Sequence, residues 1–206
     1  MKSAEVLRIF ERYLVEVVER YELCPWARGT REHGELAVGV LWGAPSLAQW
    51  VAEAERLLAG PGVAVAAVIA PELLTSRDEF GALRDRVASR IPSAGVAEFH
   101  PTAGLDLSTP ARLVPFVRRS PDPLLQLVPL ALLHAVRAAP PVADLAQQAA
   151  MLGGHAGAPR RALSARIAAA NHATVAQAHA EIAAVLEAIA QDRRTAYARV
   201  GISGSR

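Results

Sequence analysis

Lysine, cysteine and aromatic residues are scarce in this sequence. Among its 206 residues, Lys2 is the one lysine and Cys24 the one cysteine, and only 5% are Phe, Trp or Tyr. A single cysteine excludes an internal disulfide and a metal site made of cysteines alone. It is also typical of proteins in a reducing compartment, so we predict a cytoplasmic location.

Dense positive charge and long hydrophobic runs are absent too. The net charge is +2, whereas nucleic-acid-binding proteins usually carry a concentrated basic surface, so we predict no nucleic-acid partner. A transmembrane helix needs about 18 or more consecutive apolar residues, and the longest candidate, 124–136, is interrupted by Gln126, Pro129 and His134. Charged residues throughout 3–22 argue against a signal peptide. We therefore expect a soluble protein with no membrane partner.

The sequence does contain enough apolar material for a core, with 52% hydrophobic against 20% charged residues. In 3–22, apolar side chains recur at three- and four-residue steps, which predicts an amphipathic helix that ends before Pro25. Further helix starts are indicated by the capping boxes Ser46 with Gln49 and Ser76 with Glu79, and by Pro110.

Four short apolar runs bounded by turn-forming residues are predicted to be strands. They are 36–42, 63–69, 95–99 and 124–128. Strands that alternate with helices favour an α/β fold. We predict a small mixed or mostly parallel sheet of about four strands flanked by helices.

From residue 130 onward the sequence is rich in alanine and has helical periodicity. We predict an α/β core domain over 1–138, an alanine-rich C-terminal helical extension over 139–191 and a flexible tail over 192–206. Small side chains let helices approach closely, so a homodimer through the C-terminal helix is a further prediction.

Cys24 follows Leu23 and precedes Pro25, and it is a candidate nucleophile. A lone cysteine in an intracellular protein can act in this way when a histidine meets it in the fold. The nearby Arg28 and Arg31 favour a thiolate, whereas the preceding helix C-terminus disfavours it. The alternative is a structural thiol, which behaves as a small hydrophobic side chain.

His100 follows the predicted strand 95–99 and precedes Pro101. Open α/β sheets bind ligands at the carboxyl ends of their strands, and histidine titrates near neutral pH. His100 is therefore a candidate acid or base. The alternative is a histidine that forms a hydrogen bond to a loop carbonyl.

Arg118 and Arg119 are followed by Ser120 and Pro121. Paired arginines before a rigid turn can bind a carboxylate or phosphate through two parallel hydrogen bonds. We predict that Arg118, Arg119 and Ser120 bind the anionic group of a small molecule. The alternative is ordinary surface charge, or an arginine bonded to loop carbonyls.

Three motifs in this order resemble an uncharacterised bacterial family, the domain of unknown function 1415, over about residues 5–138. They are Leu23-Cys24-Pro25-Trp26-Ala27, Phe99-His100-Pro101 and Arg119-Ser120-Pro121-Asp122-Pro123. The resemblance implies that Cys24, His100, Arg119 and Ser120 meet in one pocket, and it brings no established reaction. Many members have an asparagine at the position of Arg118, and often a histidine and an arginine where this chain has Gln126 and Pro129.

Two classes of function follow from these residues. In the first, an enzyme acts on a small anionic substrate, with Cys24 as nucleophile or redox centre, His100 as proton shuttle and Arg119 as anion anchor. In the second, the chain is a non-catalytic ligand-binding or protein-interaction module. A metal bound by Cys24 and His100, with His33 or Glu98, ranks last because these residues lack the close spacing of a metal site. The sequence identifies no cofactor.

Overall fold

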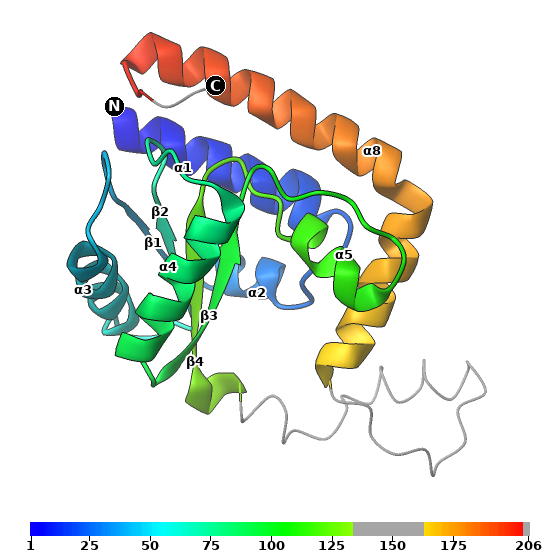
Figure 1. The fold of residues 1–206 in the computed structure, drawn as a ribbon, viewed down its shortest axis with the longest axis horizontal. Coiled ribbons are helices and arrows are strands. Elements are labelled where there is room, and N and C mark those ends of the chain that lie inside the picture. The colour runs from blue at the N-terminus through cyan, green and yellow to red at the C-terminus, as the bar shows by residue number, and fades with distance from the viewer. Residues whose placement is uncertain (134–162, 204–206) are drawn as a thin grey trace.

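In the computed structural model, which describes residues 1–133 and 163–203, four strands form one sheet in the order β1-β2-β4-β3 (Figure 1). They are β1 (Leu36–Val40), β2 (Val65–Ile69), β3 (Ala94–Phe99) and β4 (Leu124–Pro129). β1 pairs with β2 in parallel, and β4 lies antiparallel to both β2 and β3. The predicted mixed sheet of four strands flanked by helices is confirmed.

The last strand in the sequence occupies an inner position of the sheet. Helix α4 (Arg77–Arg90) connects β2 to β3, and β4 then inserts between these two strands. This is a split βαβ arrangement. Strands β1, β2 and β3 all run in the same direction, so their carboxyl ends lie at one edge of the sheet.

One face of the sheet is covered by α3 (Leu47–Leu58) and α4. Both helices begin with the predicted capping boxes, at Ser46 and Ser76. Trp50 of α3 and Phe80 of α4 are fully buried, with ring centroids 5.8 Å apart in an edge-to-face arrangement. Apolar contacts therefore hold this layer to the sheet.

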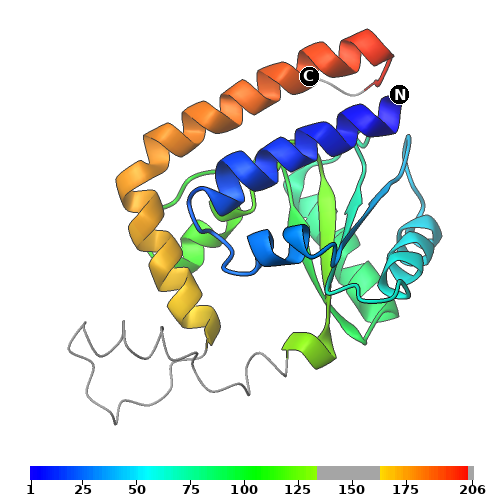
Figure 2. The same cartoon turned by 180° about the vertical axis from the view of Figure 1, so that it is seen from behind.

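The opposite face is covered mainly by α1, α5 and α8, and α1 and α8 run side by side across it (Figure 2). Side chains alternate along β2, so Ala66 and Val68 face the first layer, whereas Ala67 and Ile69 face the second. The elements of this side are α1 (Lys2–Tyr13), η1 (Leu14–Glu19), α2 (Ala27–Glu32), α5 (Pro110–Val117) and α8 (Leu163–Val200).

The N-terminal helix changes its hydrogen-bond pattern in its second half. The predicted helix over 3–22 is α-helical up to Tyr13 and continues as the π-helix η1. The amide of Leu23 accordingly bonds the carbonyl of Val18, five residues earlier, at 2.9 Å. Glu22 has a left-handed φ of 51°, a conformation that ends helices and usually favours glycine.

α8 is part of the core, which corrects the predicted separation between a core domain and a C-terminal extension. Its residues Val175, Ile182 and Ile189 are buried with those of α1. The predicted flexible tail is wrong up to Val200, because α8 continues to that residue and Tyr197 is fully buried. The predicted start of the extension at residue 139 lies outside the described residues.

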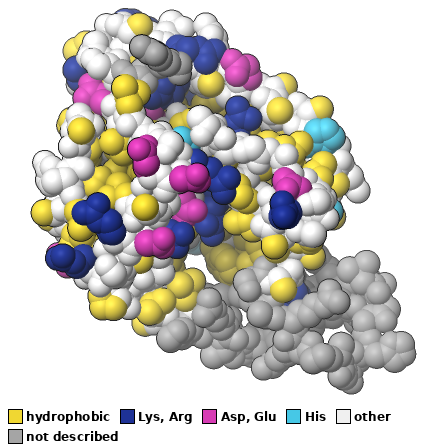
Figure 3. Space-filling model, viewed as in Figure 1, with side chains coloured by type: hydrophobic (Ala, Val, Ile, Leu, Met, Phe, Trp, Pro, Cys, Tyr) yellow, Lys and Arg dark blue, Asp and Glu magenta, His cyan; other side chains and the backbone are white. Residues whose placement is uncertain are grey.

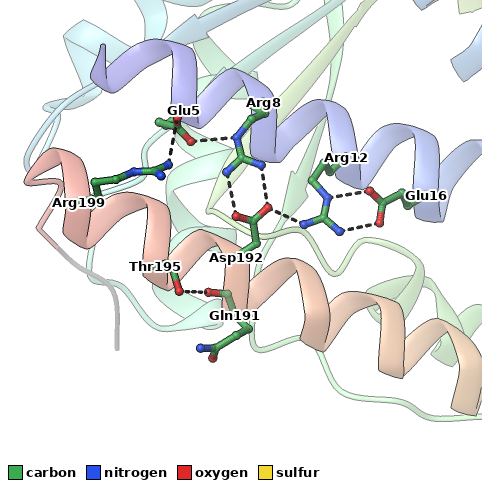
Figure 4. Close-up of polar contacts among 8 residues, drawn as sticks. All are labelled: Glu5, Arg8, Arg12, Glu16, Gln191, Asp192, Thr195 and Arg199. Carbon is green, nitrogen blue, oxygen red and sulfur yellow. Dashed lines mark hydrogen bonds and ion pairs between the residues drawn. The ribbon is translucent and has the colours of Figure 1, made fainter.

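Ion pairs fasten α8 antiparallel to α1 (Figure 4). Asp192 accepts hydrogen bonds from both Arg8 and Arg12, at 2.7 Å from Arg8 Nη1, and Arg12 also binds Glu16. Hydrogen bonds from Arg8 are the main reason that the pKa of Asp192 falls to about 2. Among the described helices, none combines the length and hydropathy needed to cross a membrane.

Candidate functional site

A cavity of about 370 Å³ lies between the sheet and the layer formed by α1, η1, α5 and α8. Figure 3 shows the surface hollowed between the sheet and α5, with hydrophobic side chains in the hollow and Lys or Arg side chains at its rim. Most residues around the cavity are apolar, among them Phe10, Leu14, Val18, Phe99, Leu113 and Ile167. A few polar side chains join them, which is typical of sites for small molecules.

Arg118 is the cationic side chain of the cavity wall. It directly follows α5, and its guanidinium lies over the ring of Phe99, 5.9 Å from the centroid. Its side chain makes no hydrogen bond to the described residues; the nearest carboxylate oxygen, on Glu98, is 3.9 Å from Nη1. Burial is the main cause that lowers the pKa of Arg118, although a guanidinium stays protonated in proteins.

The carboxylate of Glu98 is closer to a different arginine. Arg84 Nε lies 3.1 Å from Glu98 Oε2, which is shorter than the distance from Arg118 to the same oxygen. Arg84 also contacts Asp85, at 3.0 Å. The charge of Arg118 is thus only loosely balanced by the protein, and its donors remain available on the cavity wall.

Tyr13 lies at the end of α1 and also lines the cavity. Its side chain is 1% exposed, and its hydroxyl has no hydrogen-bond partner among the described residues. Burial raises the pKa of Tyr13, and the nearby Cys24 raises it further, whereas Arg118 lowers it. The hydroxyl is therefore protonated at neutral pH and can donate a hydrogen bond.

Cys24 lies on the cavity wall, in the turn between η1 and α2. The left-handed conformation of Glu22 turns the chain so that the thiol reaches this wall. Burial raises the pKa of Cys24, and hydrogen bonds from the backbone N–H groups of Trp26 and Ala27 only partly oppose it. The thiol is thus protonated at neutral pH, which suits a structural thiol better than a nucleophile.

Two side-chain amides complete the polar set. Gln126 is the polar residue in the middle of β4 and lines the cavity. Asn171 of α8 donates from Nδ2 to the carbonyl of Leu23 at 3.0 Å, so it holds the Cys24 turn against α8. Unlike Asn171, Gln126 lines the cavity without a side-chain hydrogen bond to another described residue.

His100 does not line this cavity. Its Nε2 lies 3.2 Å from the carbonyl oxygen of Thr75, and its Nδ1 lies 2.9 Å from Thr102 Oγ1. Burial lowers the pKa of His100, so the neutral ring donates to Thr75 and accepts from Thr102. The hydrogen bond to Thr75 matches the alternative given for His100 above, a histidine bonded to a loop carbonyl. A separate small cavity of about 30 Å³ lies between His100 and Arg118.

Arg119 and Ser120 also bond to loop carbonyls. Arg119 Nε donates to the carbonyl of Pro101 at 3.1 Å, and the buried Ser120 donates from Oγ to the carbonyl of Asp122 at 2.5 Å. Neither residue lines the larger cavity. Their bonds fix the turn that connects Arg118, at the end of α5, to the start of β4.

Asp122 connects this turn to α8 through a buried ion pair. Its carboxylate accepts from Arg193 Nε at 2.7 Å and from the hydroxyl of Tyr197 at 2.6 Å. Arg193 also donates to the carbonyl of Pro71 at 3.0 Å. Burial raises the pKa of Asp122, and both partners oppose that rise.

The structure therefore brings Cys24 and Arg118 to the same cavity and places His100, Arg119 and Ser120 outside it. Among the residues the structure describes, no group of three or more His, Cys, Asp or Glu could hold a metal ion. Tyr13, Gln126 and Asn171 also line the cavity, and the sequence did not mark them as site residues. One signal was present: Gln126 interrupts the otherwise apolar run Leu-Leu-Gln-Leu-Val.

No family model, curated protein or solved structure matches this chain. The resemblance to the domain of unknown function 1415 therefore stays a prediction.

Proposed function

We propose that this protein binds a small, largely apolar molecule that carries one anionic group, in the cavity between the sheet and α1, α5 and α8. The observation that carries this proposal is the Arg118 guanidinium, which lies on the wall of an apolar cavity without a hydrogen bond to the described residues. In such surroundings a charge-assisted hydrogen bond is stronger than in water.

The size of the cavity limits the ligand. At about 30 Å³ for each non-hydrogen atom in a liquid, 370 Å³ holds about 12 such atoms. The apolar walls favour a hydrocarbon or aryl body, whose burial supplies affinity, while Arg118 supplies orientation.

Binding is better supported than nucleophilic catalysis. The raised pKa of Cys24 keeps its thiol protonated, and His100, whose ring is engaged by Thr75 and Thr102, lines a different cavity. An enzyme that used Cys24 would need a base beside it. We keep the cytoplasmic location, the absence of a nucleic-acid partner and the homodimer as predictions.

Binding of an anionic amphiphile and its neutral counterpart tests the proposal. Titration calorimetry of the full chain with octanesulfonate and with 1-decanol compares a charged and an uncharged head group on bodies of similar size. We expect Arg118→Gln to weaken octanesulfonate binding about 10- to 100-fold, because it removes charged hydrogen bonds, and to change 1-decanol binding less than about 3-fold.

Arg112→Gln is the matched control, because Arg112 lies on α5, just before Arg118 in the chain, with its side chain 70% exposed and paired with Asp106. It should leave both affinities at the wild-type value. Equal binding of octanesulfonate by wild type and Arg118→Gln would refute Arg118 as the anchor.

A further inference from the structure

Tyr13 presents an unusual combination of burial and unused hydrogen-bonding capacity. The ring is fully enclosed between α1 and the sheet, and the hydroxyl has no partner among the described residues. Leaving a buried hydroxyl unpaired costs free energy, so most buried tyrosines find a partner. Such a group on the wall of a cavity indicates that a ligand atom provides the missing partner.

Tyr13 and the proposed anion anchor Arg118 line the same cavity. The cavity wall thus carries two kinds of donor, one cationic and one neutral, that one ligand could use. Gln126, also on this wall, can add an amide donor.

We propose that the ligand is a monocarboxylic acid of medium length, whose carboxylate binds Arg118 and accepts a hydrogen bond from the Tyr13 hydroxyl. This inference rests on the proposed function above and adds the chemistry of the head group. A guanidinium matches a carboxylate in planar, two-pronged geometry, and the second lone pairs of the carboxylate oxygens are free to accept from a hydroxyl.

The charge of the site favours a carboxylate over a phosphate. A phosphate monoester carries about −1.5 to −2 at pH 7 and has three acceptor oxygens. Among the described residues that line the cavity of about 370 Å³, Arg118 is the one cation, and Glu98 lies 3.9 Å from it. One cation beside a carboxylate leaves a second negative charge uncompensated, so a singly charged head group fits better.

Tyr13→Phe tests the inference, because it removes the hydroxyl and keeps the ring. The probes for the full chain are decanoate, octanesulfonate and octyl phosphate, which are similar in size and differ in head group. We expect wild type to bind decanoate most tightly. Tyr13→Phe should weaken decanoate about 10-fold or more, because the hydroxyl donates to a charged acceptor.

Thermal unfolding of the ligand-free protein separates a ligand-binding tyrosine from a structural one. If the hydroxyl is paired only when a ligand is bound, Tyr13→Phe removes an unpaired group from the ligand-free protein. The Tm of the ligand-free variant then stays equal to or above that of wild type. A structural hydroxyl would instead lower the Tm when removed. Tyr21→Phe is the control for binding, because the Tyr21 hydroxyl is also buried without a partner among the described residues but does not line the cavity, so decanoate affinity should stay at the wild-type value.

The outcomes separate this inference from the proposed function. Tighter binding of octanesulfonate or octyl phosphate than of decanoate overturns the carboxylate while keeping an anionic ligand. Unchanged decanoate affinity in Tyr13→Phe, or a lowered Tm of the empty variant, overturns the role of Tyr13. Failure of wild type to bind any of the three probes overturns both proposals.

Discussion

The two faces of the sheet are covered in different ways. Under α3 and α4 the layer is closely packed by apolar side chains such as Trp50 and Phe80, both fully buried. Under α1, α5 and α8 the layer encloses a cavity and is fastened at its edges by ion pairs, including the buried pair of Asp122 and Arg193. The comparison teaches that close packing and an open cavity lie on opposite sides of one sheet.

The largest effect is expected from removing the buried ion pair that holds α8. Asp122 and Arg193 are 2% and 8% exposed. Asp122→Ala leaves the Arg193 cation buried without its partner and should lower the free energy of unfolding by about 3–5 kcal/mol. Urea denaturation followed by circular dichroism measures this loss.

The control for this change is Arg194→Met, because Arg194 is the more exposed neighbour of Arg193 and pairs with Glu187. It should change stability by about 0.5 kcal/mol or less. A loss in Asp122→Ala as small as that in the control would mean that α8 is not clamped to the sheet, and the two faces would then not differ in the way described.

A medium effect is expected from enlarging alanines on the two faces. Ala54 of α3 is 1% exposed in the closely packed layer, so Ala54→Leu should cost about 1–3 kcal/mol through overpacking. Ala168 of α8 faces the cavity, so Ala168→Leu should be neutral or stabilising by up to about 1 kcal/mol and should weaken decanoate binding. Denaturant midpoints compare both variants with wild type, and equal destabilisation by the two would contradict the difference in packing.

The smallest effect concerns the ion pairs along α1 and α8. The pKa of Asp192 is depressed to about 2, so its contribution to stability is present above about pH 4 and is lost as the pH falls toward 2. Asp192→Asn should cost about 1 kcal/mol at pH 7, because the carboxylate is partly exposed. The difference from wild type, measured by urea denaturation, should shrink at pH 3 and in high salt. Glu55→Gln is the control, because Glu55 is exposed on α3 and its side chain makes no ion pair among the described residues. A difference as large at pH 3 as at pH 7 would contradict the ion-pair origin.

Local signals in the sequence predict the elements of the fold well. Capping residues mark the starts of α3 and α4, and short apolar runs mark each strand, because these signals act within a few residues. The inner position of β4 could not be predicted from such local signals, because strand order depends on pairing between segments far apart in the chain. The π-helical half of the N-terminal helix was likewise not predicted, because it keeps an amphipathic pattern while its hydrogen bonds shift by one residue.

Two of the candidate residues from the sequence, Cys24 and Arg118, line the cavity, and the site itself stays a proposal. The sequence could not show which of Arg118 and Arg119 lines the cavity. The two residues have the same side chain, and only the backbone at the end of α5 directs them to different places. Tyr13 resembled an ordinary core position on an amphipathic helix, and its unpaired hydroxyl is a property of the assembled layers. The alanine-rich composition does not reveal the role of α8, because its bonds join residues far apart in the chain: Asp192 accepts from Arg8, and Arg193 donates to Asp122.

The inner position of β4 also sets the order in which the chain can assemble. As the chain is synthesised, β1, β2 and β3 emerge first, but β2 and β3 have no strand between them until 124–129 follows. Asp122 then has no cation until Arg193 emerges. Contacts between such distant segments slow folding and leave strand edges unpaired in the meantime. The nascent chain therefore depends on its last segment to bury Asp122 and to close the wall of the cavity, so a chain shortened before α8 should be prone to aggregation.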